Sequence, residues 1–224
     1  MFNTILLAGS SSAEVPNYNL EITVASNTTN FNVLATAQGL GFDNSLTIDR
    51  TITLTINNWV EIYSGFQTGA LQQNTTLAVI NNGSIFGLDG TTGSNGSNGG
   101  AGFTGVIYST VTGGSATHSW INNGNLHGGR GGGGSGGRTT TFFDDGDSGG
   151  FCSAPTNTGT AGAAGGFGGT GGTGSFSGAS NPDDIADCLV FNPGTGGAGG
   201  AAIQWQGRTV SFTNNGSVSG SIIA

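Results

Sequence analysis

The sequence has no lysine and only four arginines in 224 residues, and just 7% of its residues are charged. Nucleic acids and anionic membrane surfaces are bound through clusters of Lys and Arg, which this chain lacks. Its net charge is −8 at pH 7. Proline is also scarce, with four residues, so a collagen helix is disfavoured. The sequence therefore predicts no nucleic acid partner.

Histidine, cysteine and long apolar runs are scarce as well. His118 and His127 are the two histidines, and neither has a metal-ligand or catalytic spacing. We therefore expect a protein that is not an enzyme and has neither a cofactor nor a metal. Cys152 and Cys188 are too far apart for a CxxC motif, which leaves a disulfide between two loops or two free thiols. No apolar run reaches the roughly 18 residues of a membrane-spanning helix.

Glycine, in contrast, is abundant, with 46 residues, and it falls at every third position in four tracts: 87–105, 128–137, 159–174 and 194–200. A period of three fits neither a helix nor a strand, but it is the period of polyproline II. Polyproline II makes no internal hydrogen bonds, so buried segments must bond to their neighbours. Glycine on one face allows that approach. The tracts therefore predict a packed polyproline II bundle rather than a flexible linker.

The first third of the chain alternates apolar and polar residues, as in "YNLEITVA" and "RTITLTI". A period of two is typical of β-strands. One short helix is expected within 30–39, with Asn30 as its N-cap and Gly39 at its end. We predict a β-rich N-terminal domain at 1–80 that attaches the chain to its partners.

A short repeat follows the β-rich segment. "VINNGSIFG", "WINNGNLHG" and "FTNNGSVSG" end at Gly87, Gly128 and Gly220, and "LTINNWVEIYSG" is a weak fourth copy. Asn-Gly favours a tight turn between short strands. We expect the copies to stack as equivalent rungs with insertions between them. Residues 81–224 thus form a glycine-rich domain of polyproline II helices, short β rungs and long loops, with almost no α-helix.

Three loops interrupt the glycine tracts, at 106–120, 138–158 and 175–193. All three contain aromatic residues, and the last two hold six of the nine aspartates. Loops on a rigid scaffold are common binding sites. Aromatic rings suit sugar faces, and aspartates suit hydroxyls. "DDGDSGG" favours a solvated acidic loop over a calcium site. The candidate receptor-binding residues are Tyr108, His118, Phe142, Phe143, Asp144, Asp145, Asp147, Phe151, Phe176, Asp183, Asp184 and Phe191.

In-phase glycine tracts that alternate with aromatic loops resemble the tip adhesins of T-even-like phage tail fibres. The resemblance covers about residues 77–220. It implies a layered polyproline II sandwich whose distal loops recognise a receptor on the bacterial surface, either a glycan or an outer-membrane protein. The β-rich N-terminal third departs from the attachment domain of those adhesins.

The resemblance also implies a place in the virion tail, assembled in the host cytoplasm, with the N-terminal domain bound to other tail proteins. A homo-oligomer, with a trimer as the form considered, is left open. Two other functions compete with the receptor-binding one. The first is a structural virion adaptor, and the second, less favoured, is an antifreeze protein.

Overall fold

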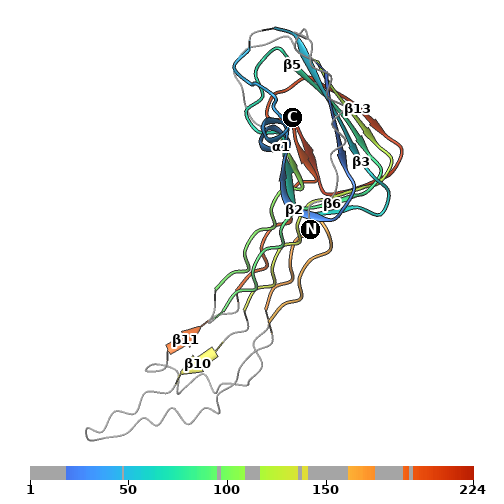
Figure 1. Ribbon diagram of the computed structural model, residues 1–224. Coiled ribbons are helices and arrows are strands. Elements are labelled where there is room, and N and C mark those ends of the chain that lie inside the picture. The colour runs from blue at the N-terminus through green and yellow to red at the C-terminus, as the bar shows by residue number, and fades with distance from the viewer. Residues whose placement is uncertain are drawn as a thin grey trace, which may run out of the picture.

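The computed structural model describes residues 19–46, 48–94, 97–108, 117–135, 161–174 and 194–224, together with the backbone of strands at 138–140 and 189–191. It is mainly β, with a single helix in the described part of the chain. Figure 1 shows a β body at one end and a bundle of extended segments that leaves it. No described helix is long and apolar enough to span a membrane.

One sheet of the β body consists of five parallel strands, in the order β1(Asn19–Val24), β3(Arg50–Ile56), β5(Thr75–Asn81), β8(His118–Asn122) and β13(Val210–Asn214). Successive side chains of a strand point to opposite faces. Accordingly, Ile52, Leu54 and Ile56 are buried, whereas the threonines between them lie on the outer face.

The second sheet contains the strands that follow these after a turn. They are β2(Thr28–Asn32), β4(Glu61–Gln67), β6(Ser84–Phe86), β9(Asn125–His127) and β14(Ser217–Ser219). Three short strands extend this sheet, namely β7(Val106–Ile107), β12(Ile203–Gln204) and β15(Ile222–Ile223). Each strand–turn–strand unit is one rung, and five rungs stack in parallel.

The three Asn-Asn-Gly repeats are stacked rungs, as the sequence predicted. Asn81 lies beside Asn122, and Asn122 lies beside Asn214 in the next rung. The weak fourth copy is also a rung, but its register is shifted. Ile56 lies beside Asn81 and Glu61 beside Ser84, so its turn is two residues longer than the turn after Asn81. Trp59 lies in this longer turn.

The helix α1(Val33–Gly39) follows β2 directly. Its N-cap is Asn32, whose side-chain oxygen accepts a 2.9 Å hydrogen bond from the backbone N–H of Ala35. The expected cap at Asn30 was wrong, because that residue lies in β2, with a positive φ of 51° at an irregularity in the strand. Val33 and Ala37 are the residues that the helix buries.

The core of the β body is continuous across residue 80. Phe66 from β4 packs edge-on against Trp120 from β8, with ring centroids 5.3 Å apart. Both sheets contain strands from before and after residue 80. A solenoid rung buries its apolar face only against its neighbours, so the rungs cannot be divided into separate domains. The expected boundary at residue 80 therefore does not separate two cores. The part of the chain that lies outside this core is the glycine-rich bundle.

The bundle consists of glycine-rich segments inserted into the second sheet. The chain leaves after β6 and returns at β7, and it leaves again after β9 and returns at β12. The described segments are 87–93, 97–105, 128–135, 161–168, 168–174 and 194–202. Figure 1 shows them running side by side away from the β body.

Backbone hydrogen bonds join these segments at every third residue. The N–H groups of Gly87, Gly90 and Gly93 donate to the carbonyls of 127, 130 and 133 over 2.7–2.8 Å. Segment 128–135 is hydrogen-bonded to all five others and is largely buried. The bundle is therefore packed around one central segment, which a flexible linker would not produce.

Candidate receptor-binding end

Segments 87–93 and 128–135 run in the same direction, because their hydrogen bonds keep a constant register. The sequence predicted this from the two Asn-Asn-Gly rungs that precede them. Segment 161–168 runs back, since Gly162, Gly165 and Gly168 donate to residues 134, 131 and 128. The chain between 135 and 161 thus begins and ends at the far end of the bundle.

The chain between 174 and 194 begins and ends at the same far end. Segment 168–174 runs outward beside 128–135, and 194–202 returns, with Gly194 donating to the Ser135 carbonyl and Gly200 to that of Gly129. A short antiparallel pair, β10(Arg138–Thr140) and β11(Leu189–Phe191), links the two connections there, with Arg138 opposite Phe191 (Figure 1). Two of the three predicted binding loops therefore start from one end.

Most of the predicted site residues lie outside the described residues: Phe142, Phe143, Asp144, Asp145, Asp147, Phe151, Phe176, Asp183 and Asp184. Cys152 and Cys188 lie outside them too, so their pairing stays a prediction. Phe191 is described by its backbone, in β11.

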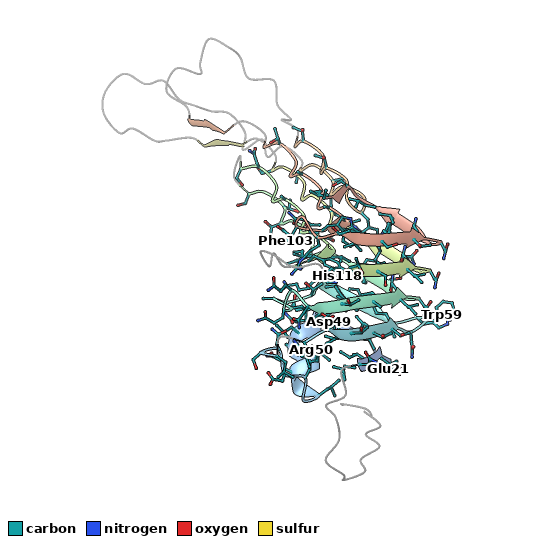
Figure 2. All side chains as sticks on the ribbon, turned by 90° about the horizontal axis from the view of Figure 1, so that it is seen from above. Glu21, Asp49, Arg50, Trp59, Phe103 and His118 are labelled. Atoms are coloured by element: carbon teal, nitrogen blue, oxygen red, sulfur yellow. The ribbon has the colours of Figure 1, made fainter. Side chains whose placement is uncertain are left out.

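Tyr108 and His118 are placed differently from what the sequence predicted. Their side chains are only 1% and 4% exposed, and Figure 2 shows His118 among the stacked strands of the β body. Tyr108 directly follows β7 and His118 begins β8. Both therefore lie next to the strands at the two ends of the predicted loop at 106–120. Their rings meet edge to face at 5.6 Å. Neither side chain is accessible to a receptor, and both are removed from the candidate set.

The buried His118 is held in a neutral form. Its Nδ1 accepts a 3.2 Å hydrogen bond from the backbone N–H of Leu77, so Nδ1 carries no proton. Burial, and to a smaller extent the positive charge of Arg208, lower the pKa of His118 from 6.5 to about 4. Burial also lowers the pKa of His127, which lies half-buried on β9.

We expect the protein to lose stability as the pH falls from about 6.5 to 4. In this window unfolded His118 binds a proton and folded His118 does not, so unfolding is favoured by up to about 3 kcal/mol. Thermal melts across this range should show the loss, and it should be smaller in His118→Asn, which retains the contribution of His127. If the melting temperature falls equally steeply with pH in both proteins, the assignment to His118 is contradicted.

An aromatic ladder fixes the bundle to the β body, and sequence reasoning missed it. The rings of Tyr63, Phe86, His127 and Phe167 follow one another at centroid distances of 5.4, 5.0 and 4.5 Å. The guanidinium of Arg130 lies over Phe167 at 4.2 Å. The sequence signal for it was that Phe86 and His127 occupy the same position in two copies of the Asn-Asn-Gly repeat, so that their rings stack. Because the ladder spans three rungs and one bundle segment, it holds the base of the bundle in place.

Few charged groups lie in the described segments of the bundle. Arg130 and Asp89 form an exposed ion pair at 3.9 Å, and Asp89 also accepts a 2.7 Å hydrogen bond from the Arg130 backbone N–H. Within the described residues, no group of three His, Cys, Asp or Glu side chains is close enough to hold a metal ion.

A stacked β body that carries a rigid glycine bundle, with long connections at the bundle's far end, defines a loop-presenting binding protein. The chain matches the family model of the phage tail fibre adhesin Gp38 over residues 19–223, and it belongs to this family. No curated protein and no solved structure matches the chain. The protein is thus a receptor-binding adhesin of a phage tail fibre, and the family places it in the virion tail as a non-enzymatic component.

Proposed function

We propose that the connections containing 138–158 and 175–193 bind the bacterial receptor, and that the glycine bundle holds them away from the virion. The observation that carries this proposal is the direction of the segments: 128–135 and 168–174 both run outward into these connections. The β10–β11 pair joins the two connections near their bases. Their Phe and Asp residues supply apolar faces and hydrogen-bond acceptors for a surface glycan or an outer-membrane protein.

The bundle suits this role because it resists bending. Its segments hydrogen-bond to one another at every third residue, and the central segment is bonded on all sides to its five neighbours. This period supports the polyproline II conformation, which has three residues per turn. Binding groups keep their geometry best on a rigid support. The bundle thus allows loops to vary in sequence while their positions stay fixed.

Attachment to other tail proteins is proposed for the N-terminal end of the β body. β1 is an edge strand of the first sheet, with β3 as its paired neighbour, so over residues 20–24 one side of its backbone has no strand beside it among the described residues. Leu20 is half-buried at this edge. A free edge of this kind accepts a further strand from a partner.

Exchanging Phe143 and Asp145 for alanine should abolish binding to host cells. Both residues lie in the proposed loop at 138–158, and removing a ring and a carboxylate takes away an apolar contact and an acceptor. The double variant and the parent protein should be compared for adsorption to whole cells, for melting temperature and for incorporation into virions.

We expect adsorption to be lost while the melting curve and virion incorporation stay unchanged. A combined loss of all three would show a structural role for these residues. If adsorption survives, the recognition surface is in the other connection, where Phe176 to Phe191 is the segment to exchange next.

A further inference from the structure

The outer face of the first sheet has an unusual chemical character. From β3 to β13 the outward side chains are uncharged. Many are small and carry a hydroxyl, such as Thr51, Thr53, Ser119 and Ser211, whereas Ile80 and Ile121 on the same face are large and apolar. The strands are parallel and in register, so these side chains form rows across the sheet. The rows therefore mix Thr and Ser hydroxyls with Ala78, Ile80 and Ile121, at strand spacings of about 4.8 Å.

A ladder of asparagine amides continues this face at the turns. The side chain of Asn123 donates to that of Asn82 over 2.9 Å, and the side chain of Asn215 donates to that of Asn123 over 2.9 Å. A side-chain amide has two N–H donors and an oxygen with two lone pairs. Each exposed amide of this ladder therefore keeps hydrogen-bonding capacity on its solvent side.

Trp59 lies in the longer turn between β3 and β4, and this turn is stacked on the turn that contains Asn82, the first member of the amide ladder. Its turn packs on the following rung, since a Cβ on Gly83 would lie 2.3 Å from the Val60 carbonyl oxygen. Trp59 is 94% exposed. Figure 2 shows it projecting from the edge of the stacked strands, on the other side of the β body from the bundle.

The conformation of Trp59 is costly as well as exposed. Its φ is 66°, in the left-handed region that a bulky side chain adopts rarely. The equivalent turns of three other rungs contain Asn-Asn-Gly, which suits a tight turn. Because its side chain is almost fully exposed, Trp59 gains little from burial that would offset this backbone conformation. An external ligand accounts for both features.

We propose that Trp59 and the ladder of Asn82, Asn123 and Asn215 form a lateral binding site for a neutral glycan chain. The indole face would stack on the apolar face of a sugar ring, and the amides would hydrogen-bond to its hydroxyl groups. The four residues of this site include no Lys or Arg and the protein has a net charge of −8, so phosphorylated or acidic glycans fit poorly. The site lies on the β body and is separate from the distal connections.

Trp59 reports on this site by itself. The other two tryptophans, Trp120 and Trp205, are 0% and 9% exposed. Acrylamide should therefore quench mainly the Trp59 emission. The probe is a panel of phosphate-free O-polysaccharides of neutral sugars, released from lipopolysaccharide by mild acid. We expect at least one of them to protect the emission from quenching in a saturable manner.

The matched variants are Trp59→Gly, Trp59→Phe and, as a control on the bundle, Leu88→Ala, whose parent side chain is 49% exposed. In a pull-down on the immobilised polysaccharide, Trp59→Gly should bind at least about tenfold more weakly, and Trp59→Phe and Leu88→Ala should bind nearly as the parent does. Glycine accepts the positive φ, so the melting temperature of Trp59→Gly should be unchanged or higher. If that variant fails to fold, Trp59→Asn replaces it, because Asn also tolerates this conformation.

Three results would overturn the proposal. The first is that no polysaccharide of the panel protects the Trp59 emission from quenching. The second is that Trp59→Gly binds the polysaccharide as well as the parent protein does. Alternatively, Trp59→Gly is incorporated poorly into virions while its glycan binding is intact, which would assign Trp59 to a protein contact. The Phe143→Ala, Asp145→Ala variant should retain polysaccharide binding at Trp59, so a failure of this site is distinguishable from a failure of the distal one.

Discussion

Gly132→Ala should lower the free energy of unfolding by at least about 3 kcal/mol, and with it the melting temperature by roughly 6–12 °C. Gly132 lies in the central segment of the bundle, where its N–H donates to Gly100 and its carbonyl accepts from Gly197. A Cβ there would lie 2.0 Å from the carbonyl oxygen of Thr91. That oxygen belongs to a backbone which is itself hydrogen-bonded, so a whole segment must move. Moving it breaks contacts along the bundle.

Gly166→Ala is the matched control for this substitution. Gly166 lies in the same bundle, but a Cβ there would have no heavy atom within 4 Å. This replacement should leave the melting temperature unchanged or slightly higher, because alanine restricts the unfolded chain. Differential scanning calorimetry of the two variants measures the difference. Equal melting curves would contradict the close packing of the central segment.

Asn122→Ala should cost about 2–4 kcal/mol of folding stability. Asn81, Asn122 and Asn214 form a second asparagine ladder, inside the β body. Asn122 accepts a 2.8 Å hydrogen bond from the side chain of Asn81 and donates one of 2.7 Å to that of Asn214. Asn81 and Asn122 are fully buried. Truncating Asn122 therefore leaves the Asn81 amide without this partner in the interior, and a buried polar group that loses its hydrogen bond destabilises the fold.

Asn123→Ala tests the same chemistry one residue further on, at the surface. Asn123 also links two rungs through its side chain, but it is exposed, so water replaces the lost hydrogen bonds. Its cost should stay below about 1 kcal/mol. Chemical denaturation of both variants gives the comparison. A cost for Asn123→Ala as large as that for Asn122→Ala would mean that burial does not determine the strength of the ladder.

The parts of the fold that sequence predicted are those with a strict local period. The Asn-Asn-Gly repeats fix the turns, and each stacked Asn side chain bonds to its copy in the next rung, so the repeats align although 41 and 92 residues separate them. Glycine at every third position leads to backbone contacts so close that a Cβ does not fit, as at Gly132. The direction of the first two outward segments followed from the rungs before them.

The parts that sequence missed depend on contacts between distant segments. Nothing in the local sequence distinguishes Tyr108 and His118 from loop residues. Both are nevertheless buried in the aromatic core, where the Tyr108 ring packs against those of His118 and Trp120. The boundary at residue 80 followed from a change in composition, but β5 and β8 pair across it. For the distal residues from 142 onward, the sequence indicated which residue types could bind a receptor. The directions of the bundle segments then showed at which end of the molecule their loops begin.

Competition with infection tests the central claim most directly. The purified protein, incubated with host cells before the phage that carries it, should occupy the receptor and reduce phage adsorption in a saturable manner. The Phe143→Ala, Asp145→Ala variant, with an unchanged melting curve, should leave phage adsorption at the level without competitor. If the parent protein fails to bind cells, or if both proteins block infection equally, these residues at the far end of the bundle do not form the receptor-binding site.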